Sequence, residues 1–202
     1  MKEKIINIVI LTICFSHSFG QFNLGFNAGL NISSLSYGSG DNNSSIVNFN
    51  AGLTTQYSIS ERLFIRAILL YSIKGYSSLL IPQGTVHTRL NYILIPTLLG
   101  VNLNRNFAFL LGPEFCILTH ASMKTGNDNT NRTNNFEKFD LGLDVAVLYN
   151  FNRKFGIELL YNYGFIKVER FYYYDTNGNV TGFERAGKNR VFAINLIYNL
   201  KS

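Results

Sequence analysis

Apolar and polar side chains alternate along most of this chain with a period of two residues. The clearest run lies at 190–200, where Phe192, Ile194 and Leu196 alternate with Ala193 and Asn195. This period is typical of a β-strand with one apolar face and one face that tolerates polar groups. Seven earlier runs resemble it, and the run at 90–102 is apolar on both faces, so its facing stays open. The predicted strands are 22–32, 47–57, 63–75, 90–102, 107–118, 139–151, 155–168 and 190–200.

The connections between these runs alternate in length. Short polar turns are predicted at 58–62, 103–106 and 152–154, and long links rich in Ser, Asn, Gly and Thr at 33–46, 76–89, 119–138 and 169–189. Outer-membrane barrels have short periplasmic turns and long external loops. The pattern therefore predicts an all-β fold, an eight-stranded antiparallel up-and-down transmembrane β-barrel.

A soluble exported barrel is the alternative, because alternation alone does not say which face meets water. The polar face is rich in Gly and Asn, which suit a narrow interior, and is poor in the Lys and Glu of a soluble exterior. Tyrosines lie on the apolar face, several near strand ends, as a membrane-interface girdle requires. These features favour the membrane barrel. The tyrosines are Tyr57, Tyr71, Tyr149, Tyr161, Tyr163 and Tyr198.

The first twenty residues read as a secretory signal. Lys2 and Lys4 precede an apolar stretch at 5–15, and small residues flank a predicted cleavage before Gln21. Bulky Ile13 before Cys14 disfavours a lipidation signal. We therefore expect a cleaved signal peptide at 1–20 and an outer-membrane β-barrel domain at 21–202.

The composition argues against a disulfide-linked secreted protein and against a nucleic-acid-binding protein. Cys116 is the only cysteine after residue 20, so no intrachain disulfide can form in the mature chain. The net charge of +6 is modest and its basic residues are scattered, so we expect no nucleic-acid partner.

Six short segments, in order, resemble the porin-family, PorT-like outer-membrane β-barrel domain. The resemblance implies an eight-stranded barrel in the outer membrane of a Gram-negative cell, and one relative is associated with protein export. Ile68 and Leu94 stand where family members often carry Glu, and the chain does not end on the usual terminal aromatic. The segments are 69–75, 90–96, 111–114, 139–142, 161–164 and 189–192.

Charged residues on the predicted polar face form the first candidate site. Eight strands enclose an interior just wide enough for side chains, so we expect a filled lumen and no open pore. A gated ion path is one interpretation, and a structural plug of ion pairs is the favoured one. The candidate lumen charges are Arg66, Lys74, Glu114, Asp140, Asp144 and Glu158.

The second candidate is aromatic. Tyr172, Tyr173 and Tyr174 lie in a predicted external loop, where they could bind a sugar or a partner. The alternative is a strand that continues above the membrane with its tyrosine girdle.

No catalytic motif, cofactor site or complete metal site is apparent. Cys116 and His120 are predicted to share a strand face, but two ligands are too few for a metal.

We therefore expect a non-enzymatic outer-membrane barrel of structural or surface-binding role. An accessory of protein secretion or assembly is the second hypothesis, and a soluble ligand-binding barrel is the third. The expected partners are outer-membrane lipid and surface or secretion-machinery proteins.

Overall fold

The computed structural model describes residues 22–38, 43–80, 84–126 and 128–200. The predicted signal peptide at 1–20 lies outside the described residues. Among the residues described, no helix is long and apolar enough to cross a membrane.

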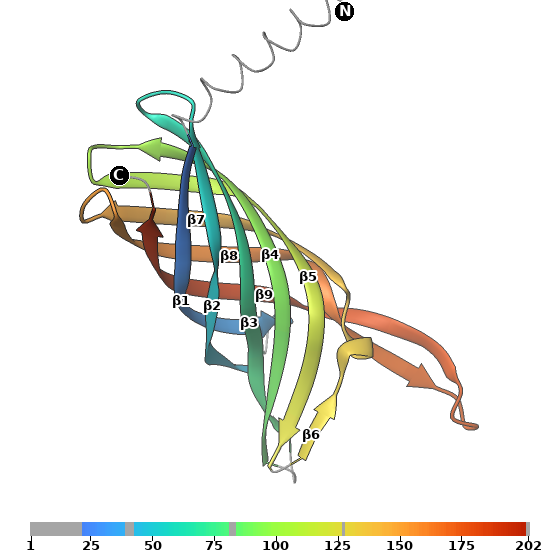
Figure 1. Cartoon of the computed structure of the whole chain (residues 1–202). Coiled ribbons are helices and arrows are strands. Elements are labelled where there is room, and N and C mark those ends of the chain that lie inside the picture. Colours follow the sequence, from blue (N-terminus) through green and yellow to red (C-terminus); the bar gives the residue numbers. More distant parts are fainter. Residues whose placement is uncertain (1–21, 39–42, 81–83, 127, 201–202) are drawn as a thin grey trace, which may run out of the picture.

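Eight long antiparallel strands close into a ring (Figure 1). Each strand pairs with its neighbours in the chain, β5 pairs with β7, and β1 pairs with β9 to complete the ring. A short β6 adds to β5 outside this ring and is followed by the 3-10 helix η1 (Thr133–Asn135). The strands are β1 (Phe22–Ser36), β2 (Asn43–Ser58), β3 (Leu63–Leu80), β4 (Gly84–Asn102), β5 (Phe107–Thr125), β6 (Asp128–Asn131), β7 (Phe139–Asn150), β8 (Phe155–Tyr174) and β9 (Val180–Asn199).

The apolar face of the wall points outward. Leu24 and Val47 are 57% and 63% exposed, whereas Asn27 and Asn31, on the other face of β1, are buried. A β-carbon on Gly29 would lie 2.2 Å from the carbonyl oxygen of Ile194, so the interior is as narrow as its glycines predict. The ambiguous β4 directs Leu90, Leu94 and Leu98 inward.

The three short turns are stabilised by side-chain oxygens at one end of the barrel. Asn104 Oδ1 accepts hydrogen bonds from the backbone N–H groups of Asn106 and Phe107, both at 2.9 Å. Asn152 makes the same pair of contacts, and Ser60 Oγ accepts from the N–H groups that follow it. Such local bonds are the reason that Asn and Ser favour turns. Beside these turns, aromatic pairs such as Phe107 and Tyr149, 4.7 Å apart, cover the outer wall.

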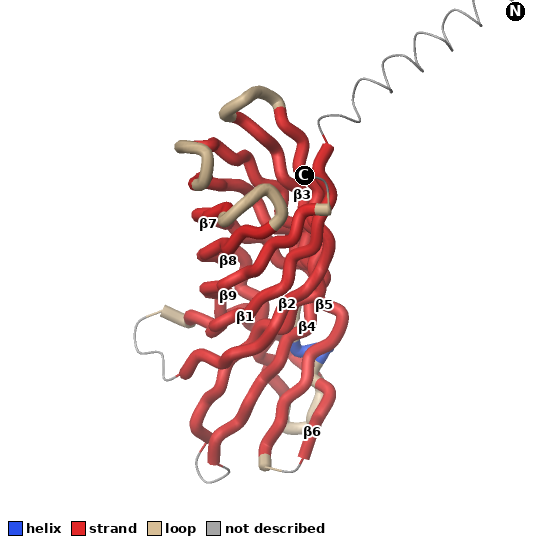
Figure 2. The backbone as a smooth tube through the Cα atoms, turned by 60° about the vertical axis from the view of Figure 1, so that its left-hand side comes forward, coloured by secondary structure: helices blue, strands red, loops and turns tan. Residues whose placement is uncertain are grey.

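The opposite end differs from the prediction in one respect. The links expected to be long irregular loops are largely strand where the structure describes them, because β3, β5 and β8 extend beyond residues 75, 118 and 168, where the predicted strands end (Figure 2). The β5–β6 and β8–β9 hairpins project from the ring at this end. We call this the hairpin end, and the opposite one the turn end.

A β-bulge changes the facing of upper β5. Asn91 pairs with His120 and Tyr92 pairs with Leu118, so Thr119 is the extra residue. Cys116 is therefore buried in the lumen, while His120 is exposed. The expectation that these two residues share a face is wrong, because a residue inserted between them reverses the alternation.

Candidate functional site

All six candidate lumen charges lie inside the barrel, and each is at most 3% exposed. Arg66 and Glu158 form an ion pair of 3.0 Å between Nη1 and Oε2. Arg66 also donates to Gln56, and Asn195 donates to Glu158 at 3.1 Å. The ion pair thus joins β3 to β8, and hydrogen bonds from β2 and β9 fix its two side chains.

Asparagine side chains extend this network around the lumen. Asn50 donates to Asn195 at 3.0 Å and to Asn31 at 2.8 Å, and Asn31 donates to Ser72 at 2.7 Å. A continuous chain of side-chain hydrogen bonds therefore joins non-adjacent strands across the interior. Such bonds satisfy polar groups that would be costly to bury alone.

Lys74 and Glu114 form a second ion pair, 2.7 Å from Nζ to Oε1. The thiol of Cys116 lies 3.1 Å from the same carboxylate oxygen, and the ring of Tyr92 lies 5.4 Å from the Lys74 ammonium. Cys116 is therefore part of the packing around this pair.

The two aspartates of β7 have amide partners in place of cations. Asn189 donates to Asp140 at 2.7 Å, and Asn162 donates to Asp144 at 2.6 Å. Ile68 and Leu94 also point inward and form an apolar part of the same interior.

The lumen is filled at its middle and hollow at both ends. The gap lined by Asn27, Lys74 and Glu114 measures about 20 Å³, which is space for about one water molecule. A funnel of about 1050 Å³ opens at the turn end, and a cavity of about 670 Å³ opens at the hairpin end. We call the latter the rim cavity.

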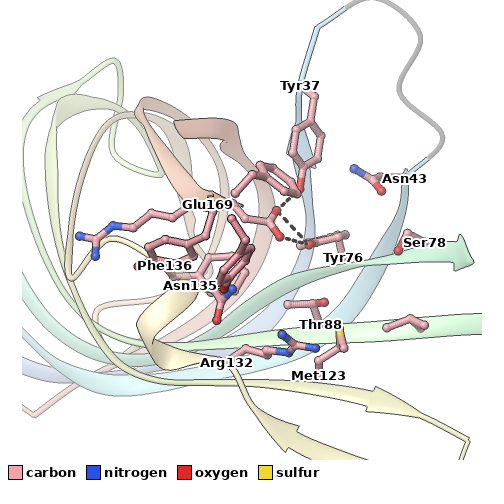
Figure 3. Close-up of a pocket in the computed structure, with 15 residues that line it drawn as sticks. Tyr37, Asn43, Tyr76, Ser78, Thr88, Met123, Arg132, Asn135, Phe136 and Glu169 are labelled. Atoms are coloured by element: carbon pink, nitrogen blue, oxygen red, sulfur yellow. Dashed lines mark hydrogen bonds between the residues drawn. The ribbon is translucent and has the colours of Figure 1, made fainter. Parts of the chain in front are cut away.

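The half-buried carboxylate of Glu169 lies on one side of the rim cavity (Figure 3). The hydroxyl of Tyr76 donates to Glu169 at 3.0 Å, and the hydroxyl of Tyr37 donates to the same carboxylate. Glu169 takes part in no ion pair within the part of the chain that the structure describes. Burial raises its pKa, and the two hydroxyl donors oppose that change. Burial likewise raises the pKa of Tyr37, which therefore stays a donor.

Arg132 lies on another side of the rim cavity (Figure 3). Its Nε is buried and has no hydrogen-bond partner among the described residues. An arginine donor and a carboxylate of opposite charge thus face one cavity without pairing in the described structure. Aromatic side chains, among them Phe136 and Phe171, complete the wall.

A partly buried ion-pair cluster anchors the segment that follows Arg132. Arg170 donates to both oxygens of Glu137, at 2.8 and 2.6 Å, and Arg185 donates to the first of them. The hydrogen bond from Arg170 is the main reason that the pKa of Glu137 falls to about 2. This cluster ties the segment before β7 to the β8–β9 hairpin.

The three candidate tyrosines lie in strand β8 and not in a loop. Tyr172 and Tyr174 line the rim cavity, and the Tyr172 hydroxyl donates to the backbone oxygen of Asn134 at 2.9 Å. Tyr173 instead donates to Glu184 at 2.7 Å and does not line the cavity.

Sequence reasoning missed Glu169, Arg132 and Glu137, because all three fell in links predicted to be irregular. It also treated the lumen asparagines only as a feature of the polar face and did not predict their hydrogen-bond network. Their alternation with apolar residues was the available signal, but their partners depend on register across strands.

Comparison with known proteins agrees with this architecture. A model of the outer membrane protein beta-barrel domain matches residues 15–170, more than half of the chain. The chain belongs to this outer membrane protein beta-barrel domain family. It is a bacterial outer-membrane β-barrel, and the hairpin end is the extracellular one by the rule that long connections lie outside. This location overturns the soluble alternative, and nothing in the match is specific to PorT.

Solved structures show the same fold in other members of the small outer-membrane barrel class. Neisserial surface protein A is similar with a TM-score of 0.52 and 16% identity, over 88% of this chain and 96% of that one. The attachment invasion locus protein Ail of Yersinia pestis is similar with a TM-score of 0.50 and 12% identity, over 89% of this chain and 99% of that one. At these identities the likeness shows the fold alone. No curated protein sequence matches the chain.

Proposed function

We propose that this family member is a closed surface-binding barrel that holds a small ligand in its rim cavity. The main support for the proposal is the difference in free volume along the barrel axis. The middle leaves about 20 Å³, whereas the extracellular end opens to about 670 Å³. Ligand pockets fall in the range of about 300–1,000 Å³ and combine apolar walls with a few polar groups. The arrangement supports binding and gives no route for conduction.

The charges of the rim cavity indicate a zwitterion with an apolar body. The guanidinium of Arg132 and the carboxylate of Glu169 both line the cavity, so the first offers donors for a carboxylate and the second an acceptor for an ammonium group. Aromatic walls suit an apolar or aromatic body between them. A short peptide unit with free ends combines these features.

Titration calorimetry with the dipeptide glycyl-phenylalanine tests this proposal on the refolded barrel. We expect binding of the free dipeptide, weaker binding after N-acetylation or C-amidation, and weaker binding by Arg132→Gln. The Arg132→Gln variant should lose its preference for the free acid over the amide.

Tyr173→Phe is the matched control, because Tyr173 lies outside the cavity. Equal binding of all three peptide forms, or no binding by a correctly folded barrel, would contradict the proposal. The secretion-accessory role, the PorT-like specificity and a purely structural role stay predictions, and a secretion defect on deletion would favour the first of them.

A further inference from the structure

A second, outward-facing polar groove is formed by residues of β4, β5 and β6 at the hairpin end. Figure 1 shows these three strands side by side. Its volume is about 410 Å³, and none of the residues that line it is acidic. We call it the β4–β6 groove. Its polar side chains are Thr85, His87, Arg89, Ser122, Lys124 and Asn129.

The facing of this groove follows from strand alternation. Val86, Thr88 and Met123 line the rim cavity on the inner side of the same strands. Their neighbours His87, Arg89 and Lys124 therefore point away from the barrel axis, and all three are exposed. The groove and the rim cavity are thus on opposite sides of one wall.

The basic groups of the groove are crowded. His87 lies directly opposite Lys124 in the β4–β5 register, and Arg89 follows two residues further along the same face. Arg89 and Lys124 are therefore diagonal neighbours on one face, within reach of each other's long side chains, and their like charges repel. Neither Arg89 nor Lys124 forms an ion pair with any residue in the described ranges. An anion from outside the chain would relieve this repulsion.

Nearby acids do not fill that role. Asp128 is adjacent to Asn129 on β6, and alternation directs it to the other face. Glu137 already holds Arg170 and Arg185, and Glu169 points into the rim cavity.

The position of the groove indicates which anion fits. Below it on the same outward face lie Ile93 and Ile95 of β4 and Phe115 and Ile117 of β5. Arg89 lies four residues before Ile93, roughly 13 Å along the strand, which reaches the headgroup layer above the hydrocarbon core. A phosphate in the groove would thus have acyl chains directly against the wall beneath it. Basic residues at this level attract anionic lipid, and Arg and Lys bind phosphate.

We propose that the β4–β6 groove binds the phosphorylated headgroup of a glycolipid in the outer leaflet, of the lipid A type. Arg89 and Lys124 bind the phosphate, and the hydroxyl and amide groups beside them bind the sugar. This site is independent of the rim cavity and of its ligand.

Lipid retention by native mass spectrometry tests the site on the refolded barrel. The probes are diphosphoryl lipid A, the same lipid without phosphates, phosphatidylglycerol and inorganic phosphate. We expect diphosphoryl lipid A to bind best, and the double variant Arg89→Gln/Lys124→Gln to bind it about tenfold or more weakly, as expected for the loss of two basic residues at an anionic surface.

The control is Arg62→Gln/Arg105→Gln, which removes two exposed arginines from the turn end. It should keep the wild-type affinity, and heat-modifiable gel migration checks that both variants fold. Equal binding of dephosphorylated lipid A or of phosphatidylglycerol would overturn the proposal. Inorganic phosphate that competes at similar concentration would show a soluble-anion site and overturn it too.

Discussion

Within the barrel, the residues that matter most are charged groups with partners fixed by distant parts of the chain. Lys74 and Glu114 are 40 positions apart in sequence and are joined only by strand register. Removing one member of a buried pair leaves the other charge without compensation, whereas removing both restores balance.

We therefore expect Lys74→Met and Glu114→Gln each to cost about 3–5 kcal/mol of unfolding free energy. The double variant should cost clearly less than the sum of the two, because the residues are coupled. Urea unfolding in lipid vesicles measures these changes in the free energy of unfolding. Lys154→Met, which removes an exposed lysine at the turn end, is the control and should change stability by less than about 0.5 kcal/mol. Additive losses in the double variant would show that the pair is not coupled.

Glu137 gives a pH-dependent prediction. Its folded pKa of about 2 lies below its ordinary value, so the contact with Arg170 and Arg185 is fully present above that ordinary value. The contact is lost as pH falls through the folded pKa.

We expect the Nε–H NMR signal of Arg170 to stay protected from neutral pH down to about pH 3 and to lose protection near pH 2. Glu137→Gln should remove both the protection and its dependence on pH. Loss of protection between pH 5 and 4 in the wild type would contradict the assigned pairing.

At the scale of elements, the bulge at Thr119 sets the facing of the upper part of β5. Deleting Thr119 would leave His120 as the single outward residue between Leu118 and Ala121, so the bulge would be lost while the inward and outward positions beyond it stay the same. Met123 would still line the rim cavity, and Lys124 would still point outward.

We expect the Thr119 deletion to keep dipeptide binding at the rim cavity, because the facing of Met123 is unchanged. Thr119→Ala keeps the bulge and loses only the 2.9 Å bond to the backbone oxygen of Asn91, so it should cost about 1 kcal/mol. Loss of dipeptide binding by a folded deletion variant would show that the upper part of β5 had changed its facing.

The strands also show which features the sequence alone predicts. The side of the sheet to which a side chain points depends only on its own strand, so alternation correctly placed Leu24 outside and Glu158 inside. Pairing is not local: the contact of Arg66 with Glu158 spans 92 positions and depends on the combined register of the strands between them. The same reason explains why the hairpin extensions, the bulge and the grouping of Arg132 with Glu169 could not be predicted from composition.

For the whole molecule, the family membership and the outward apolar face agree on a barrel bathed by lipid. Ion pairs and hydrogen bonds of asparagine side chains fill the middle of the lumen and separate its two hollow ends. The two binding sites that we propose lie at the hairpin end and on its outer wall, and the buried ion pairs lie in the middle of the lumen.

The central claim is that this zone closes the barrel. Single-channel recording of the refolded protein in planar bilayers tests it most directly, with a known porin as the positive control. We expect no steady conductance under an applied voltage. Reproducible conductance steps on the nanosiemens scale, which disappear when the protein is left out, would contradict the claim.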